Sequence, residues 1–156
     1  EIKLKQFVED VKDKYSLKNS EICLSGFSQG SMMSINLGLT NKENYNCVVG
    51  FSGKVINQED LIKRKTSSTK MLLIHGDKDE VVAPTFLLEA KDFLIRLKCE
   101  VETKMIKDCS IYSFLYLKFH KKETPIFLRV FLIYRLINYY CHKIHIFLNI
   151  SIHFSR

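Results

Sequence analysis

The segment EICLSGFSQGSMM, residues 21–33, decides the fold that this sequence predicts. Residues 21–25 are a short, mostly apolar run that ends at Gly26, which is typical of a buried strand. The mostly apolar residues 31–39 indicate a buried helix. The five residues GFSQG at 26–30 therefore place a G-x-S-x-G pattern directly between a strand and a helix.

This pattern suits a serine nucleophile for steric and electrostatic reasons. In so tight a turn only hydrogen fits two positions before and after the serine, which explains Gly26 and Gly30. The turn strains the backbone of Ser28 and raises its hydroxyl clear of the sheet. The backbone N–H of Gln29, at the start of the helix, can then donate to an oxyanion. Because the bare pattern is weak by itself, an ordinary glycine-rich turn is the alternative.

Beyond this turn the chain keeps alternating between helix and strand patterns. Apolar residues recur at helical spacing over 4–15, and buried strands are expected at 47–51 and 71–75. A helix is expected to begin near Pro84, and residues 99–105 alternate as a half-exposed strand near a sheet edge does. The pattern predicts an α/β fold with a parallel sheet covered on both faces, and a ligand site at the carboxyl ends of its strands.

A second motif, HGDKDEVVAP at 75–84, follows another predicted strand. A catalytic triad needs a carboxylate that orients the histidine, and in this fold that carboxylate comes after the serine along the chain. Asp77 and Asp79 are both available for this role, and each could instead cap the helix near Pro84. We expect Asp79 to be the triad carboxylate and Asp77 to be the cap. His75 is interpreted as a structural residue at the strand end.

Composition excludes several classes of protein. The chain has 156 residues, 46% hydrophobic and 26% charged, which suits one soluble domain and excludes collagen-like, mucin-like and wholly disordered chains. The five cysteines lack paired C-x-x-C spacing, so neither a disulfide framework nor a zinc site is predicted. We interpret Cys23, Cys47 and Cys99 as small core residues. No metal and no organic cofactor is expected.

The two motifs together resemble the phospholipase/carboxylesterase branch of the α/β-hydrolase fold, which includes the acyl-protein thioesterases. The resemblance covers about residues 1–108. It implies that Ser28 is the nucleophile, that Gln29 contributes to the oxyanion hole and that Asp79 is the triad acid. FSG at 51–53 is similar to the family's strand end beside the site.

The sequence departs from this family in two places. The serine turn arrives by residue 26, so the strands that precede it in the family, and the early His-Gly loop with the second oxyanion donor, are expected to be missing. The triad histidine should follow the strand after the Asp79 helix, but residues 105–111 contain no histidine. His120 is the nearest, and weak, candidate.

The departure coincides with a break in composition. Residues 110–156 hold seven of the basic residues and one acidic residue, so they carry +6 of the net charge of +7, and residues 1–109 carry +1. We therefore expect a partial α/β-hydrolase domain at 1–108 and a non-homologous basic, aromatic-rich tail at 109–156, with a shifted reading frame near Cys109–Ser110 as the hypothesis for its origin. This distribution argues against a nucleic-acid partner.

Three roles can be weighed for the tail. Residues 125–137 are apolar but contain Arg129 and Arg135 and are shorter than the roughly 20 residues that span a bilayer. The tail could instead lie on a membrane surface. A metal site at Cys141, His142 and His145, with His153, is not expected, since neither a fixed fourth ligand nor a framing fold is present.

The expected function is hydrolysis of small carboxylic acyl esters or thioesters by a truncated, C-terminal fragment that is weakly active or inactive. The alternative is a non-catalytic remnant or a membrane-surface protein that uses the basic tail. A cytoplasmic location is expected, because the charged residues 1–14 do not form a signal peptide.

Overall fold

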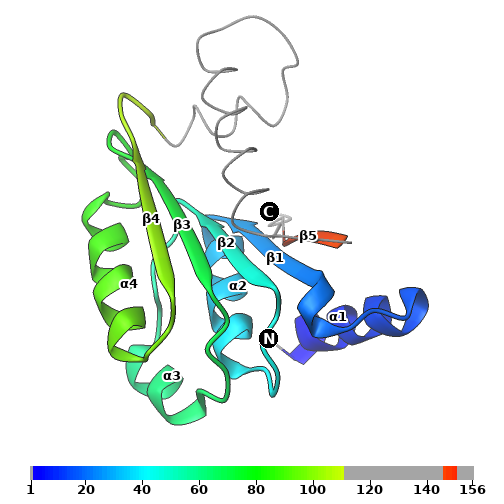
Figure 1. The fold of residues 1–156 in the computed structure, drawn as a ribbon. Coiled ribbons are helices and arrows are strands. Elements are labelled where there is room, and N and C mark those ends of the chain that lie inside the picture. Colours follow the sequence, from blue (N-terminus) through cyan, green and yellow to red (C-terminus); the bar gives the residue numbers. More distant parts are fainter. Residues whose placement is uncertain (1, 111–145, 151–156) are drawn as a thin grey trace, which may run out of the picture.

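A parallel β-sheet forms the centre of the molecule in the computed structural model, which describes residues 2–110 and 146–150 (Figure 1). Its strands lie in the order β4-β3-β2-β1-β5, and every neighbouring pair is parallel. Their bounds are β1 Ile22–Phe27, β2 Cys47–Phe51, β3 Met71–Gly76, β4 Val101–Ile106 and β5 Ile146–Ile150. The parallel α/β sheet that the sequence predicts is confirmed.

Helices connect the parallel strands, because consecutive parallel strands need a crossover. Figure 1 shows α2, α3 and α4 grouped on one side of the sheet and α1 next to its β1 side. The bounds are α1 Ile2–Tyr15, a 3-10 turn Asn19–Glu21, α2 Gln29–Thr40, α3 Gln58–Arg64 and α4 Thr85–Arg96. The strand alternation requires a helix where α3 lies, but only Leu61 of α3 is buried, so no apolar stripe marks its position.

The core lies on both faces of the sheet, as the alternation of side chains along each strand requires. On one face, Leu24 and Leu73 belong to the same buried cluster as Leu37 of α2 and Phe93 of α4. On the other face a second cluster consists of strand residues only, and its buried members are Cys23, Cys47, Val49, Leu72 and Ile74. Because both sets are buried, the strands read as continuous apolar runs in the sequence.

The two cysteines of the second cluster lie opposite each other on neighbouring strands. Cys23 pairs in register with Cys47, and their sulfur atoms are 3.1 Å apart. Burial raises the pKa of the Cys23 thiol to about 12, so this thiol is protonated at neutral pH. A protonated, buried thiol is a small core group rather than a nucleophile.

The two outer strands differ in origin. β4 borders the sheet and has half-exposed and exposed positions along its length, so the expected edge strand is confirmed. β5 comes from the segment that the sequence separates from the domain, and it pairs with β1. The division at residue 108 stays a prediction. His120, residues 125–137 and the group at 141–145 lie outside the described residues.

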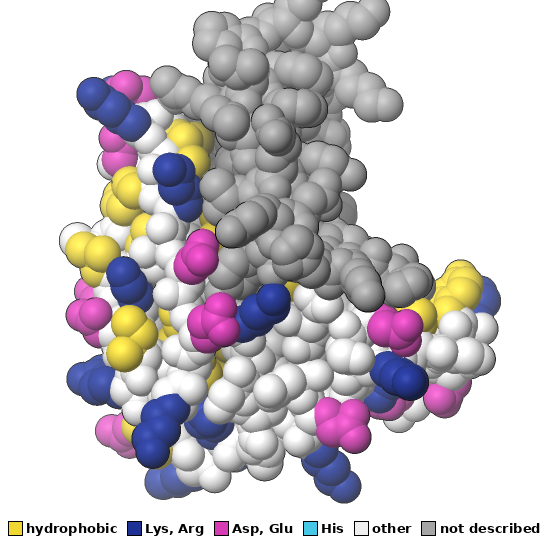
Figure 2. All heavy atoms as spheres, viewed as in Figure 1, with side chains coloured by type: hydrophobic (Ala, Val, Ile, Leu, Met, Phe, Trp, Pro, Cys, Tyr) yellow, Lys and Arg dark blue, Asp and Glu magenta, His cyan; other side chains and the backbone are white. Residues whose placement is uncertain are grey.

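The described surface carries both signs of charge. On the face shown in Figure 2, Lys and Arg side chains are interspersed with Asp and Glu, and neither sign forms a continuous patch. This agrees with the near balance of charge in residues 1–109. None of the helices in the described part of the chain is long and apolar enough to cross a membrane.

Candidate active site

Ser28 lies in the turn between β1 and α2, in a strained backbone conformation. Its φ is 53° and its ψ is −114°, values that L-residues rarely adopt. Its backbone N–H donates to the carbonyl oxygen of Phe51 at 2.8 Å, which ties the turn to the end of β2. The side chain is half-buried and makes no capping hydrogen bond to the helix, so its hydroxyl is available to other groups.

Close backbone packing explains the first glycine of the pattern. A β-carbon at Gly26 would overlap the carbonyl carbon and oxygen of Gly30, at the start of α2. The helix therefore turns back directly against the end of the strand. Only a residue without a side chain permits this approach at position 26, and the strain at Ser28 follows from it.

The start of α2 provides one donor for an oxyanion. Gln29 is the first residue of the helix, and its backbone N–H has no hydrogen-bond partner within the described residues. The partial positive charge at a helix N-terminus favours an anion at this position. The sequence predicts this donor at Gln29. An early loop that supplies a second donor is not found in the described residues that precede β1, which form α1 and a 3-10 turn.

Asp79 is buried in the loop that follows β3. The residue is only 4% exposed, and Oδ1 accepts hydrogen bonds from the backbone N–H groups of Val81 at 3.0 Å and Val82 at 2.9 Å. Oδ2 has no hydrogen bond within the described residues and lies 3.4 Å from Nε2 of His75. The carboxylate is thus held through one oxygen, while the other retains its capacity to accept.

His75, at the end of β3, holds the same loop. Its Nε2 lies 2.9 Å from the carbonyl oxygen of Val82. Because a carbonyl only accepts, Nε2 carries the proton and donates. The ring is 1% exposed. A buried imidazole that donates through Nε2 to a backbone carbonyl is a structural group, as the sequence suggests. Its Nδ1, the nitrogen that could accept a proton, is buried and has no hydrogen-bond partner within the described residues.

Asp77 does not cap α4, and that expectation is wrong. Its Oδ1 accepts a hydrogen bond from the backbone N–H of Cys109 at 3.1 Å, beyond the end of β4. Desolvation, the largest single influence, raises the pKa of Asp77. Hydrogen bonds from backbone N–H groups, that of Cys109 foremost, and the nearby Lys78 together outweigh it and hold this pKa below its usual value. Pro84 precedes α4 without any side-chain cap.

The nucleophile candidate and the acid candidate lie at the same edge of the sheet. Ser28 follows β1 and Asp79 follows β3, with β2 between them. Two strand spacings correspond to about 9.6 Å, which is too far for a direct hydrogen bond, so a third group must connect the two. His75 is the one histidine among the described residues, and it faces Val82 instead. His120 lies outside those residues.

Ser52 lies at the end of β2, between these two residues; the resemblance places FSG at 51–53 beside the site but gives Ser52 no role. Its φ is 45°, its side chain is fully buried, and its hydroxyl has no hydrogen-bond partner within the described residues. Its backbone N–H donates to the carbonyl oxygen of Ile74 at 2.9 Å. The spacing of apolar residues does not reveal a positive φ in a serine, so the conformation of Ser52 could not be predicted.

A strained serine between a strand and a helix, and a buried carboxylate two strands away, define the α/β-hydrolase class of site. The sequence profile of the phospholipase/carboxylesterase family matches residues 2–113. The match spans well over half of the sequence, and the chain belongs to this family of hydrolases. The resemblance inferred from the two motifs is confirmed.

Solved structures agree with this assignment. The chain is similar to esterase PE8, with 28% identity over 86% of this chain and 58% of that protein and a TM-score of 0.70. It shares its fold with SOBER1 of Arabidopsis thaliana, at 20% identity over 70% and 53% of the two chains and a TM-score of 0.64. A serine hydrolase homologue from Coxiella burnetii has 23% identity over 85% and 56% and a TM-score of 0.58.

The coverage values also show how much of each relative this chain spans. The chain spans little more than half of each of these relatives, between 53% and 58%. The activity of the whole relatives is therefore a matter of proposal for this chain.

Proposed function

We propose that this chain is a serine hydrolase of carboxylic esters or thioesters in which Ser28 attacks the acyl carbonyl. The observation that carries the proposal is the backbone of Ser28, with φ 53° at the strand-to-helix turn and close packing of Gly26 on Gly30 behind it. Such strain persists where surrounding structure enforces it, and it presents the hydroxyl at the ligand-binding edge of the sheet.

The other groups take roles that follow from their environment. The N–H of Gln29 stabilises the oxyanion that forms when Ser28 adds to the carbonyl. Asp79 orients a histidine through Oδ2, the oxygen left without a hydrogen bond, while Oδ1 is fixed by Val81 and Val82. Collapse of this intermediate breaks the bond to the alcohol or thiol, which leaves and takes up a proton, and the acyl group stays on Ser28. Water then hydrolyses the acyl–Ser28 ester to a carboxylic acid and free serine.

No base for Ser28 is identified among the described residues. His75 is buried on β3, with β2 between it and Ser28, and donates to Val82, so we do not assign it as the base for Ser28. Because triad members act as a unit, turnover by the polypeptide alone is expected to be weak or absent. His120 is the candidate that would change this. The remnant and membrane-surface alternatives depend on the tail, and no described residue favours either.

Acylation of Ser28 tests the proposal independently of turnover. The full chain is treated with 4-nitrophenyl butyrate, and the adduct is located by peptide mass spectrometry. We expect a butyryl group on Ser28, slow release of it, and no adduct at the neighbouring Ser25 or Ser31. Ser28→Ala should remove the adduct. Modification spread over surface lysines with Ser28 unlabelled would overturn the proposal, and fast turnover that is lost in His120→Ala would identify the base.

A further inference from the structure

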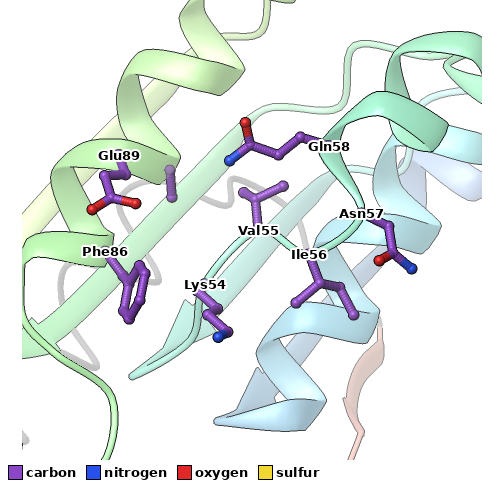
Figure 3. Close-up of a pocket in the computed structure, with 8 residues that line it drawn as sticks. Lys54, Val55, Ile56, Asn57, Gln58, Phe86 and Glu89 are labelled. Carbon is purple, nitrogen blue, oxygen red and sulfur yellow. The ribbon is translucent and has the colours of Figure 1, made fainter.

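A pocket beside the serine turn has the chemistry of an anion-binding site. It has a volume of about 370 Å³, at the lower end of the range for small-molecule sites. One wall is the loop after β2, residues 54–58, and the other is formed by Phe86, Glu89 and Ala90 of α4. Figure 3 shows Lys54 and Phe86 at one end of the pocket, Gln58 and Glu89 at the other, and Val55 between them.

The pocket adjoins Ser28 through a single glycine. Gly53 directly precedes Lys54, and a β-carbon built on it would lie 3.2 Å from the carbonyl oxygen of Ser28. On the opposite wall, α4 begins shortly after the loop that holds Asp79. A group bound in the pocket therefore lies beside the edge of the sheet that carries both Ser28 and Asp79.

Lys54 is the cation of this pocket, and it is held in place. Its ammonium lies 4.9 Å from the centre of the Phe86 ring, within the range of a cation–π contact, and its side chain is half-buried. Within the described residues no carboxylate lies at ion-pair distance from it, that of Glu89 included. A partly desolvated ammonium without a counter-charge is stabilised by an anion that enters the pocket.

We propose that this pocket binds a carboxylate or phosphate on the substrate, through the Lys54 ammonium. The acceptable ester or thioester then carries a negative charge in the part that enters the pocket. Glu89 at the far end is exposed and repels a second negative charge there, so the site favours one anionic group near Phe86. The substrate part of this inference rests on the proposed function; the anion site does not.

Binding is measured first, on the full ¹⁵N-labelled chain by NMR titration with glutarate, inorganic phosphate and neutral pentanamide. We expect glutarate or phosphate, but not pentanamide, to shift the backbone amides of residues 54–58 and 86–90. Lys54→Met should weaken anion binding about tenfold or more, the effect of one charge-assisted hydrogen bond, and Lys54→Arg should retain it. Lys63→Met, an exposed lysine of α3, is the matched control and should bind as the wild type does.

The 4-nitrophenyl monoester of glutarate and the 4-nitrophenyl ester of pentanoate then compare a charged with a neutral acyl group. Faster acylation of Ser28 by the charged ester, lost in Lys54→Met, supports the proposal. The proposed anion site is wrong if neither glutarate nor phosphate shifts these amides, or if Lys54→Met binds the anions as tightly as the wild type does. If the anions bind but the two esters acylate Ser28 at the same rate, the pocket does not select the substrate. Anion binding without any Ser28 adduct overturns the hydrolase proposal and leaves the pocket standing.

Discussion

The ends of β1 and β3 fix their candidate catalytic groups by opposite means. At the end of β1, backbone packs on backbone: Gly26 lies against Gly30, and Ser28 takes a strained conformation as a result. At the end of β3, hydrogen bonds hold the groups: His75 donates to Val82, and Asp79 accepts from the same turn. The turn after β1 depends on a residue without a β-carbon, whereas the loop after β3 depends on hydrogen-bonding side chains. The two sites should therefore respond differently to substitution.

The largest effect is expected for Gly26→Ala. The added methyl group would overlap the backbone of Gly30, which cannot move without displacing α2, so we expect a loss of about 3 kcal/mol of folding free energy. Urea-induced unfolding measures it. Gly38→Ala is the matched control, because its methyl group would meet the Val48 side chain and helix propensity offsets part of the cost. An equal loss in both variants would contradict the role of backbone packing at β1.

His75→Phe tests the hydrogen-bonded end. The ring volume is approximately kept, but the buried carbonyl of Val82 loses its donor, so we expect a loss of about 2 kcal/mol in unfolding free energy. Hydrogen exchange of the Val81 and Val82 amides should also accelerate, since the loop that holds Asp79 opens more often. Wild-type stability together with unchanged exchange would show that Val82 does not need His75.

Ser28→Gly should have the opposite sign. Glycine adopts positive φ without steric cost, so this variant is expected to be about 1 kcal/mol more stable than Ser28→Ala, which keeps the strain. Neither variant should form the acyl adduct. Thermal or urea unfolding of the pair isolates the strain, because both lack the hydroxyl. Equal stability of the two would mean that the turn at Ser28 stores none.

The smallest effect concerns Asp77, which joins the ends of β3 and β4. Its pKa is lowered in the folded protein, so its contribution to stability is complete above its ordinary pKa of 3.8 and is lost as the pH falls through the lower folded value. Asp77→Asn should therefore reduce the acid sensitivity of the urea midpoint below about pH 4. At pH 6 the wild type should still have a higher urea midpoint than Asp77→Asn. An identical pH profile in both proteins would exclude this carboxylate as a contributor.

Most strands and helices could be predicted because their signals are local. The buried strands at β1, β2 and β3 are short apolar runs, and α4 shows helical spacing of its buried residues. α3 could not be located, since only Leu61 is buried and the rest of its side chains face solvent or half-exposed positions. The role of Asp77 was wrongly predicted for the same reason. Its partner Cys109 is distant in sequence, so a cap on the nearby helix was preferred.

The sequence by itself determined strands β1 to β4, helices α1, α2 and α4 and the glycine-flanked turn at Ser28. These features depend on neighbouring residues and on what a residue without a β-carbon permits. Only the tertiary structure decided how the strand ends are joined. Three features arise where strand ends, loops and the start of α4 come together at one edge of the sheet. They are the contact of Lys54 with Phe86, the hydrogen bond between His75 and Val82 and the isolated hydroxyl of Ser52. Such contacts depend on distances in space that no period along the chain encodes.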